Sequence, residues 1–226
     1  MNSSLIECLM NSKDTLTCLI PYAYEPTWVY VFLVGMMLLS AVGLPFPEEA
    51  TLVSVGILAY MGAHPDKYPP PFPGAPYVHA QSAAVVAFLA VFTADFIIYG
   101  IGRLFGRQVF EWKPVRAILS EENRKKIEAW TIKYGAYACG IFRFTPGIRF
   151  PGHMACGMLK FPVWKFALID GIAALISVPT QILLLAHYGE NILGFLKQFK
   201  IVVLCLLLAA ALVFIYKRWI KRPSIQ

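Results

Sequence analysis

The stretch PFPEEATL, residues 45–52, interrupts a long apolar run and decides how the chain is expected to fold. Before it lies WVYVFLVGMMLLSAVGL (28–44), and after it lies VSVGILAYMG (53–62). Proline removes a backbone donor and clashes with the preceding turn, so a helix cannot run straight through Pro45 and Pro47. In lipid, the freed backbone groups need partners in protein or in a wet cavity. The stretch therefore predicts two short helices that meet at a break inside the membrane.

The composition predicts an integral membrane protein. Of the 226 residues, 58% are hydrophobic and 15% are charged, more apolar surface than a soluble domain of this length can bury. Full spans need about 20 apolar residues, and we predict them at 82–102, 161–186 and 199–216. The broken apolar regions 28–62 and 134–160 predict re-entrant hairpins. The predicted fold class is an all-α polytopic membrane protein with three full spans and two opposed re-entrant helical hairpins.

Charge distribution predicts the orientation of the chain. Residues 103–133 hold eight basic and four acidic side chains, and the C-terminal tail holds four basic residues and no acid. By the positive-inside rule both are cytoplasmic, which leaves the N-terminus outside. SEENRKKIEAW, in the connector, has the Ser cap and early acids of a short surface helix. We divide the chain into an N-terminal interfacial segment (1–27), a membrane domain (28–186) and a C-terminal span with a basic tail (187–226).

A weak internal repeat fits an inverted arrangement of the two hairpins. Aligning residues 56–58 (GIL) with residues 157–159 (GML) places Glu48 opposite Arg149. Each hairpin is followed by a polar connector and then by a span that contains an acid. Inverted repeats of this kind underlie many transporters, although chance can also produce so short an alignment.

Glu48 and Glu49 are the first candidate functional residues. One interpretation is structural, because acids in the first turn after a proline suit the start of a helix at the membrane surface. The apolar sequence on both sides argues for depth instead, where a charge costs about 2.5–3.5 kcal/mol on insertion scales. Burial and mutual repulsion favour protonation of one of the two acids, which makes them candidate proton carriers.

Arg143 and Arg149, in FRFTPGIRF, bracket the second break at Pro146 and Gly147. Arginine keeps its charge inside a protein, so it needs a carboxylate, backbone carbonyls or a phosphate as a permanent partner. Snorkelling to the cytoplasmic interface is the structural alternative. Two arginines around a Pro-Gly turn, facing a hairpin that carries two acids, indicate an internal polar site.

Three further polar residues lie within apolar segments. Asp95 is followed by Tyr99 and Arg103 at four-residue steps on one helix face. An intramembrane acid is by default a functional hypothesis, but Asp95 can equally pair with an arginine to hold the helices together. Asp170 poses the same question. His153, close to the arginines, fits a packing role better than a ligand role.

The cysteines show neither a metal pattern nor a disulfide pattern. Cys139, Cys156 and Cys205 lie in apolar segments, where cysteine is expected to act as a small hydrophobic residue. Cys8 and Cys18 can form a disulfide if the N-terminus is extracytoplasmic, and the spacing does not decide it. No nucleotide, metal or nucleophile motif is found, so we expect no cofactor, no enzymatic activity and no nucleic-acid binding.

Four motifs together resemble the DedA (SNARE-associated, VTT-domain) membrane proteins. They are P-x-P-x-E at 45–49, D-x-x-x-Y-x-I-G-R-x-x-G at 95–106, F-R-F-x-P-G-x-R at 142–149 and A-x-G at 155–157. The resemblance implies opposed re-entrant hairpins, no cofactor and movement of lipids between leaflets of the bacterial inner membrane, linked to proton-motive force. The implied lipids are undecaprenyl phosphate or a phospholipid such as phosphatidylethanolamine.

The resemblance also implies which residues function. They are Glu48, Glu49, Asp95, Arg103, Arg143 and Arg149, supported by Tyr99, Pro45, Pro47, Pro146, Gly147 and His153. In this scheme Arg143 and Arg149 bind the substrate phosphate, and the acids balance them and carry protons. Two departures from the family are the proline-rich loop 65–76 and His153 itself.

The functional hypothesis is a flippase-like or scramblase-like lipid transporter with protons as the coupled ion. A membrane scaffold whose buried ion pairs are only structural is the main alternative, and a membrane lipid phosphatase or transferase ranks last for lack of a nucleophile. The sequence leaves open whether sodium replaces protons. It also leaves open whether the glycine-rich helix faces form a homo-oligomer or serve internal packing.

Overall fold

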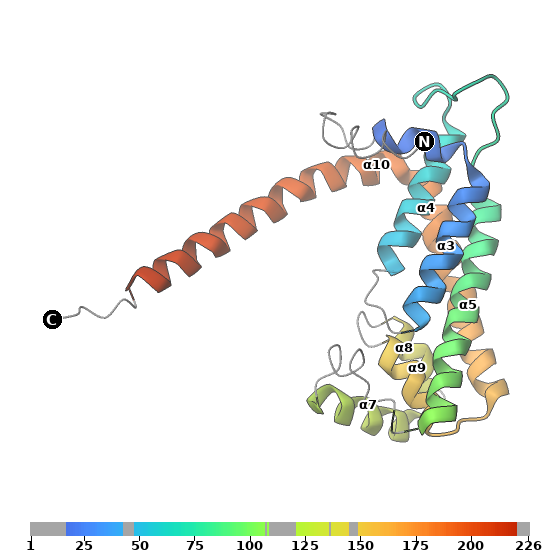
Figure 1. Ribbon diagram of the computed structural model, residues 1–226, viewed down its shortest axis with the longest axis vertical. Helices are drawn as coiled ribbons and strands as arrows, with labels where there is room; N and C mark the ends of the chain where they lie inside the picture. The colour runs from blue at the N-terminus through green and yellow to red at the C-terminus, as the bar shows by residue number, and fades with distance from the viewer. Residues whose placement is uncertain are drawn as a thin grey trace. The chain divides into compact units, whose positions relative to one another are not determined.

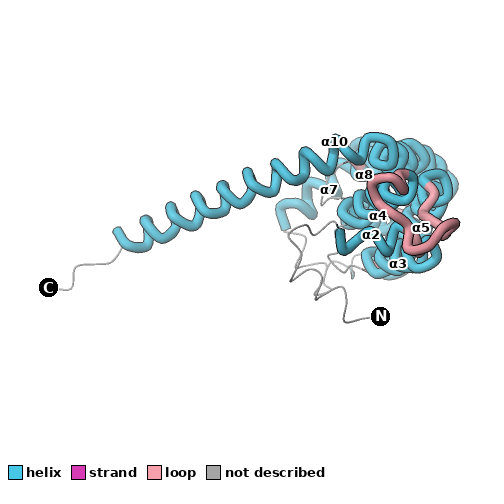
Figure 2. The backbone as a smooth tube through the Cα atoms, turned by 90° about the horizontal axis from the view of Figure 1, so that it is seen from above, coloured by secondary structure: helices cyan, strands magenta, loops and turns pink. Residues whose placement is uncertain are grey.

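The structure is a computed structural model that describes residues 17–42, 48–106, 108, 121–135, 137–144 and 149–220, with the side chains of the last segment described to residue 192. The described part consists of helices and loops and contains no strand, as Figure 2 shows, which confirms the all-α class. The helices are η1 (Thr17–Leu19), α2 (Ile20–Ala23), α3 (Pro26–Ala41), α4 (Glu48–Ala63), α5 (Ala80–Phe105), α7 (Glu121–Tyr134), α8 (Tyr137–Arg143), α9 (Arg149–Met158) and α10 (Val163–Ile220). Pro45, Pro47, Pro146, Gly147 and Cys8, which the sequence singled out, lie outside the described residues.

Within the described residues, two helical segments are long and apolar enough to cross a membrane. They are the 26 residues of α5 and the first 30 residues of α10, Val163–Ile192. At 1.5 Å per residue these reach about 39 Å and about 45 Å, beyond the ~30 Å hydrocarbon core. They coincide with the spans expected at 82–102 and 161–186. The span expected at 199–216 falls in the part of α10 without described side chains.

The backbone of α10 is non-helical at Tyr188 (φ −102°, ψ 18°). The chain divides at this point into two compact units, Met1–His187 and Tyr188–Gln226. All the features described below belong to the first unit.

Helices α3 and α4 lie on either side of the PFP break, and each is 16 residues long. At about 24 Å each is shorter than the hydrocarbon core. Helix α4 begins at Glu48 with Glu49 in its first turn, where acids complement the helix dipole. Helices α3, α4 and α5 pack side by side (Figure 1). Glu48 therefore lies at the N-terminal end of α4, which packs against α5.

Helix α5 packs closely against α9 because glycine occupies two contact points. A Cβ atom on Gly102 would lie 2.1 Å from the carbonyl oxygen of Met154, and one on Gly157 would lie 2.0 Å from that of Tyr99. The rest of the buried α5 face is also mostly small, with Ala83, Ala84, Ala87, Ala90 and Ala94. Small side chains let the two backbones approach, as in membrane helix pairs generally. This approach puts Asp95, which lies on the same α5 face, against α9.

A disulfide joins α8 to α9, between Cys139 and Cys156, whose Cα atoms are 6.6 Å apart. Both residues are fully buried, in a core that includes Phe142 and Phe166. The expectation that these two cysteines act as separate small hydrophobic residues is wrong. The pairing arises because the chain reverses between α8 and α9, which no local cysteine spacing encodes. The bond lies one turn from Arg143 on α8.

Candidate functional site

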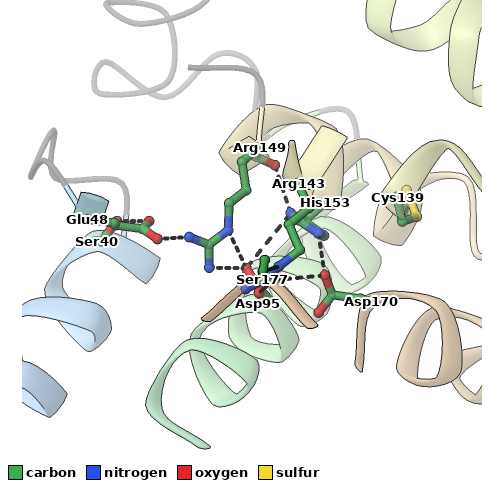
Figure 3. Close-up of polar contacts among 10 residues, drawn as sticks. Ser40, Glu48, Asp95, Cys139, Arg143, Arg149, His153, Asp170 and Ser177 are labelled. Atoms are coloured by element: carbon green, nitrogen blue, oxygen red, sulfur yellow. Dashed lines mark hydrogen bonds and ion pairs between the residues drawn. A yellow bond between two sulfur atoms is a disulfide. The ribbon is translucent and has the colours of Figure 1, made fainter. Parts of the chain in front are cut away.

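The structure gathers six ionisable side chains into one connected network, which we call the acid–arginine cluster (Figure 3). Its members come from five helices and lie in the first compact unit. They are Glu48 on α4, Asp95 on α5, Arg143 on α8, Arg149 and His153 on α9, and Asp170 on α10. The two breaks in the sequence thus supply helix ends that converge on the acids of two long helices.

Asp95 lies at the centre of the acid–arginine cluster. Its Oδ2 accepts a hydrogen bond from Nη1 of Arg143 at 2.7 Å. Its Oδ1 accepts two from Arg149, from Nη2 at 2.8 Å and from Nε at 3.1 Å. The Asp95 side chain is completely buried, with an exposed fraction of 0%. Both carboxylate oxygens are therefore bound to guanidinium groups, one from each helix of the second break.

Arg149 also links the two breaks to each other. Its Nη1 donates to Oε2 of Glu48, and the hydroxyl of Ser40 on α3 donates to Oε1 of the same carboxylate. Glu48 and Arg149 are the residues that the internal repeat aligned, and each starts its helix. Their side chains are 13% and 12% exposed, against 4% for Arg143. The Glu48–Arg149 pair is therefore the most accessible edge of the cluster.

Arg143 connects α5 to α10. Besides Asp95, its Nη1 donates to Oδ1 of Asp170 at 3.2 Å, and its Nε donates to Oγ of Ser177 at 3.0 Å. Asp170 and Ser177 lie two turns apart on α10, next to the buried stripe that includes Ala174 and Val178. The sequence pointed to Asp170 as an intramembrane acid, but it did not indicate the serines.

His153 belongs to the cluster as well as to the apolar core. Its Nε2 lies 3.0 Å from Oδ1 of Asp170, and its Nδ1 lies 2.9 Å from the carbonyl oxygen of Arg149. The ring also meets the Phe166 ring edge to face, with 5.5 Å between centroids. His153 therefore has the packing role expected from the sequence, and it also forms hydrogen bonds within the cluster. The sequence signal for this second role was its position one turn after Arg149 on the same helix face.

Three residues that the sequence grouped with the site are not members of the acid–arginine cluster. The hydroxyl of Tyr99 donates to the carbonyl oxygen of Phe161, and Nη1 of Arg103 donates to the Tyr99 hydroxyl at 2.8 Å and to the same carbonyl at 3.0 Å. Both residues therefore attach the end of α5 to the segment between α9 and α10. Glu49 has an exposed side chain beside the cluster. A functional role for these three residues stays a prediction.

The donor set of the cluster does not fit a divalent metal ion. Asp95, His153 and Asp170 each offer a ligand atom, and these atoms lie within 4.8 Å of one another. However, both oxygens of Asp95 are already bound to guanidinium groups. A dication placed there would face two permanent positive charges at close range. Chemically, the arrangement is suited instead to holding two arginines beside carboxylates between apolar helices.

Comparisons with known proteins find relatives among membrane proteins. The family model of the VTT domain matches residues 25–191. A membrane protein of Haemophilus influenzae is 30% identical over 158 residues, which cover 70% of this chain and 68% of the relative. An inner membrane protein of Borreliella burgdorferi is 24% identical over 83% of this chain and 81% of the relative.

A third relative, the membrane protein YbfM of Bacillus subtilis, is 28% identical over 56% of this chain and 68% of its own length. The names of these relatives state no enzymatic activity. No solved structure matches the chain. The domain match covers α3 to α10 up to residue 191, which includes every member of the acid–arginine cluster. The chain therefore belongs to the DedA/VTT-domain family of membrane proteins.

Proposed function

We propose that this protein moves a phosphate-bearing lipid between the leaflets of the bacterial inner membrane and couples the movement to protons. The acid–arginine cluster carries the proposal, because two permanent cations and three acids lie buried between apolar helices. Ionisable groups at membrane depth are costly and typically mark substrate or proton pathways. The lipid is undecaprenyl phosphate or a phospholipid such as phosphatidylethanolamine, since both carry a phosphate group that a guanidinium binds through two parallel hydrogen bonds.

In the proposed topology, α3–α4 and α8–α9 are re-entrant hairpins that enter from opposite sides. The lengths of these helices, 16, 16, 7 and 10 residues, support this, because none of them crosses a ~30 Å core alone. Full spans are α5, the first part of α10 and residues 199–216. The N-terminus is outside and the C-terminus is cytoplasmic, as the basic residues of 103–133 and of the tail predict.

Arg149 and Arg143 are the proposed phosphate ligands. A guanidinium binds phosphate through two parallel charge-assisted hydrogen bonds, which makes it a stronger partner than a neutral donor. The Glu48–Arg149 pair is the first point of contact because it is the most accessible edge of the cluster. Protonation of Glu48 removes its charge and frees Nη1 of Arg149 for the lipid. Loss of the proton restores the ion pair and releases the phosphate.

The lipid tails stay in the bilayer during this movement. Helix α10 supports this, because one side of it exposes large apolar residues while the cluster lies on the other. The exposed residues are Leu168, Ile172, Leu175, Ile176 and Leu183. A headgroup then needs a polar path only for itself, and the cluster provides the charges along that path.

Lipid movement in proteoliposomes tests the proposal. Purified protein is reconstituted with fluorescent phosphatidylethanolamine or with a polyprenyl phosphate, with and without a pH gradient. Arg149→Ala and Glu48→Gln should abolish movement, whereas Lys126→Gln, at an exposed ion pair on α7, should not. Folded wild-type protein that moves neither lipid under any gradient would contradict the proposal.

A scaffold function is the second candidate, because every arginine of the cluster is already bound to an acid. Glu48→Gln separates the two functions, because its amide oxygen still accepts from Nη1 of Arg149 but the side chain does not titrate. A scaffold needs only the contact, so it should keep its function in this variant. A transporter needs a titratable acid on α4, so it should be inactive.

A further inference from the structure

Both ring nitrogens of His153 face hydrogen-bond acceptors. Nδ1 lies 2.9 Å from the backbone carbonyl oxygen of Arg149, which can only accept, so Nδ1 carries a hydrogen. Nε2 lies 3.0 Å from Oδ1 of Asp170, a carboxylate oxygen. A hydrogen bond between these two atoms needs one more hydrogen, either on Nε2 or on the carboxyl group. The pair therefore contains one proton more than a neutral histidine and a carboxylate would.

The charges of the cluster independently indicate the same additional proton. Among the described residues, three carboxylates, from Glu48, Asp95 and Asp170, face two guanidinium groups. One negative charge is left unbalanced in a site where Asp95, Asp170 and His153 are completely buried. An uncompensated charge at such a site is strongly disfavoured. One added proton makes the cluster neutral.

We propose that His153 and Asp170 together hold an exchangeable proton, and that this pair is a second proton-binding site of the cluster, besides Glu48. The proton is shared between Nε2 of His153 and the Asp170 carboxyl group. The coupling of this proton to lipid movement rests on the proposed function; the presence of the proton does not. The site differs from the acids that the sequence indicated as proton carriers, Glu48 and Glu49.

The surroundings of the pair favour a proton over a larger cation. Oδ2 of Asp170 is buried and has no hydrogen-bond partner among the described residues, so it is a second position for the proton on the same carboxyl group. The Phe166 ring covers the imidazole on one side. The charged and titratable groups around the pair, by element, are Glu48 on α4, Asp95 and Tyr99 on α5, Arg143 on α8 and Arg149 on α9. Asp95 Oδ1 is 3.8 Å from Nδ1 but is bound to Arg149.

The proton also determines how Arg143 is held. Oδ1 of Asp170 is shared between His153 and Nη1 of Arg143, at 3.0 Å and 3.2 Å. When the proton leaves, Asp170 has a full charge and attracts Arg143 away from Asp95, at 2.7 Å on the other side. Proton release and a change of partner for one of the proposed phosphate ligands are then the same event.

The test is ¹⁵N NMR of the full-length protein in lipid bilayers, with the histidine rings labelled. The chain has four histidines, and His153→Asn identifies the His153 signal. His64 is the matched control, because its Nδ1 lies 2.8 Å from the carbonyl oxygen of Tyr60 one turn back in α4. We expect the His153 ring to carry hydrogens on both nitrogens, with the His64 ring as the reference signal.

Infrared difference spectra between wild type and Asp170→Asn show whether the Asp170 carboxyl group is protonated. A neutral His153 together with a protonated Asp170 carboxyl group would equally support the proposal. A neutral His153 with an ionised Asp170 would overturn it, and so would a bound metal ion that elemental analysis finds in wild type but not in His153→Asn. If Asp170→Asn does not fold, the acid band is sought in wild type against His153→Asn instead.

A second measurement separates this proposal from the proposed function. In the proteoliposome assay, His153→Asn should move lipid at the same rate with and without a pH gradient, and His64→Asn should respond to the gradient as wild type does. An extra proton on the pair in a protein that moves no lipid would leave the proton site intact and refute the transport function. Gradient-dependent transport by His153→Asn would refute the role of the pair in coupling.

Discussion

Replacement of Asp95 by asparagine should destabilise the protein strongly, because it removes the carboxylate that two buried arginines share. Asparagine keeps the shape of the side chain, so no cavity forms and only the charge is lost. Breaking a buried ion pair by removing one partner costs about 3–5 kcal/mol. In this structure Arg143 keeps Asp170 at 3.2 Å, and Arg149 keeps Glu48. We therefore expect the lower end, about 3 kcal/mol.

The assay is SDS titration of the purified protein in detergent micelles, followed by circular dichroism, which gives the free energy of unfolding. Lys126→Ala is the control, because its ion pair with Glu122 at 2.6 Å is as short as those of the cluster but is largely exposed. Exposed pairs of this kind contribute little to stability. The contrast between the two variants isolates burial as the cause.

A double-mutant cycle tests the same prediction through the coupling energy between Asp95 and Arg143. Asp95→Asn and Arg143→Gln should together cost less than the sum of the two single variants, because Oδ2 of Asp95 and Nη1 of Arg143 are 2.7 Å apart. Coupling energies between contacting residues are about 0.5–3 kcal/mol. Additive losses, or a loss below about 1 kcal/mol for Asp95→Asn, would refute the reasoning, since they would mean that water reaches the guanidinium groups.

Two further predictions concern the framework of the site. Gly157→Ala places a Cβ 2.0 Å from the carbonyl oxygen of Tyr99 and should cost about 1–3 kcal/mol in the same titration, while Gly100→Ala, with nothing within 4 Å, should not destabilise. Equal effects would mean that α5 and α9 are not in close contact. Removing the Cys139–Cys156 disulfide, which closes 17 residues, should cost about 3 kcal/mol. Alkylation of the unfolded, unreduced protein should leave both cysteines unmodified, and labelling of both would show that the bond is absent.

The sequence by itself determined the helical class, the two long apolar helices, and the separation of α3 from α4 and of α8 from α9. Each of these follows from local chemistry: apolar length gives α5 and the first part of α10, and proline-containing stretches separate α3 from α4 and α8 from α9, although Pro179 lies inside α10. It also identified Asp95, Arg143 and Arg149, because a charged residue within an apolar segment stands out without any knowledge of its partners. The pairing of Glu48 with Arg149 was visible only as a short internal alignment, which chance could have produced.

Only the tertiary structure decided which of the candidate residues are in contact. The sequence placed His153 one turn after Arg149, but its contact with Asp170 appears only in the structure, where α10 brings the carboxylate to Nε2. The Cys139–Cys156 bond likewise depends on the reversal between α8 and α9. Tyr99 and Arg103 share a helix face with Asp95 but contact Phe161 instead of the cluster. Periodicity orders residues along one helix, whereas hydrogen bonds between helices depend on close packing through glycine and alanine, which no single segment encodes.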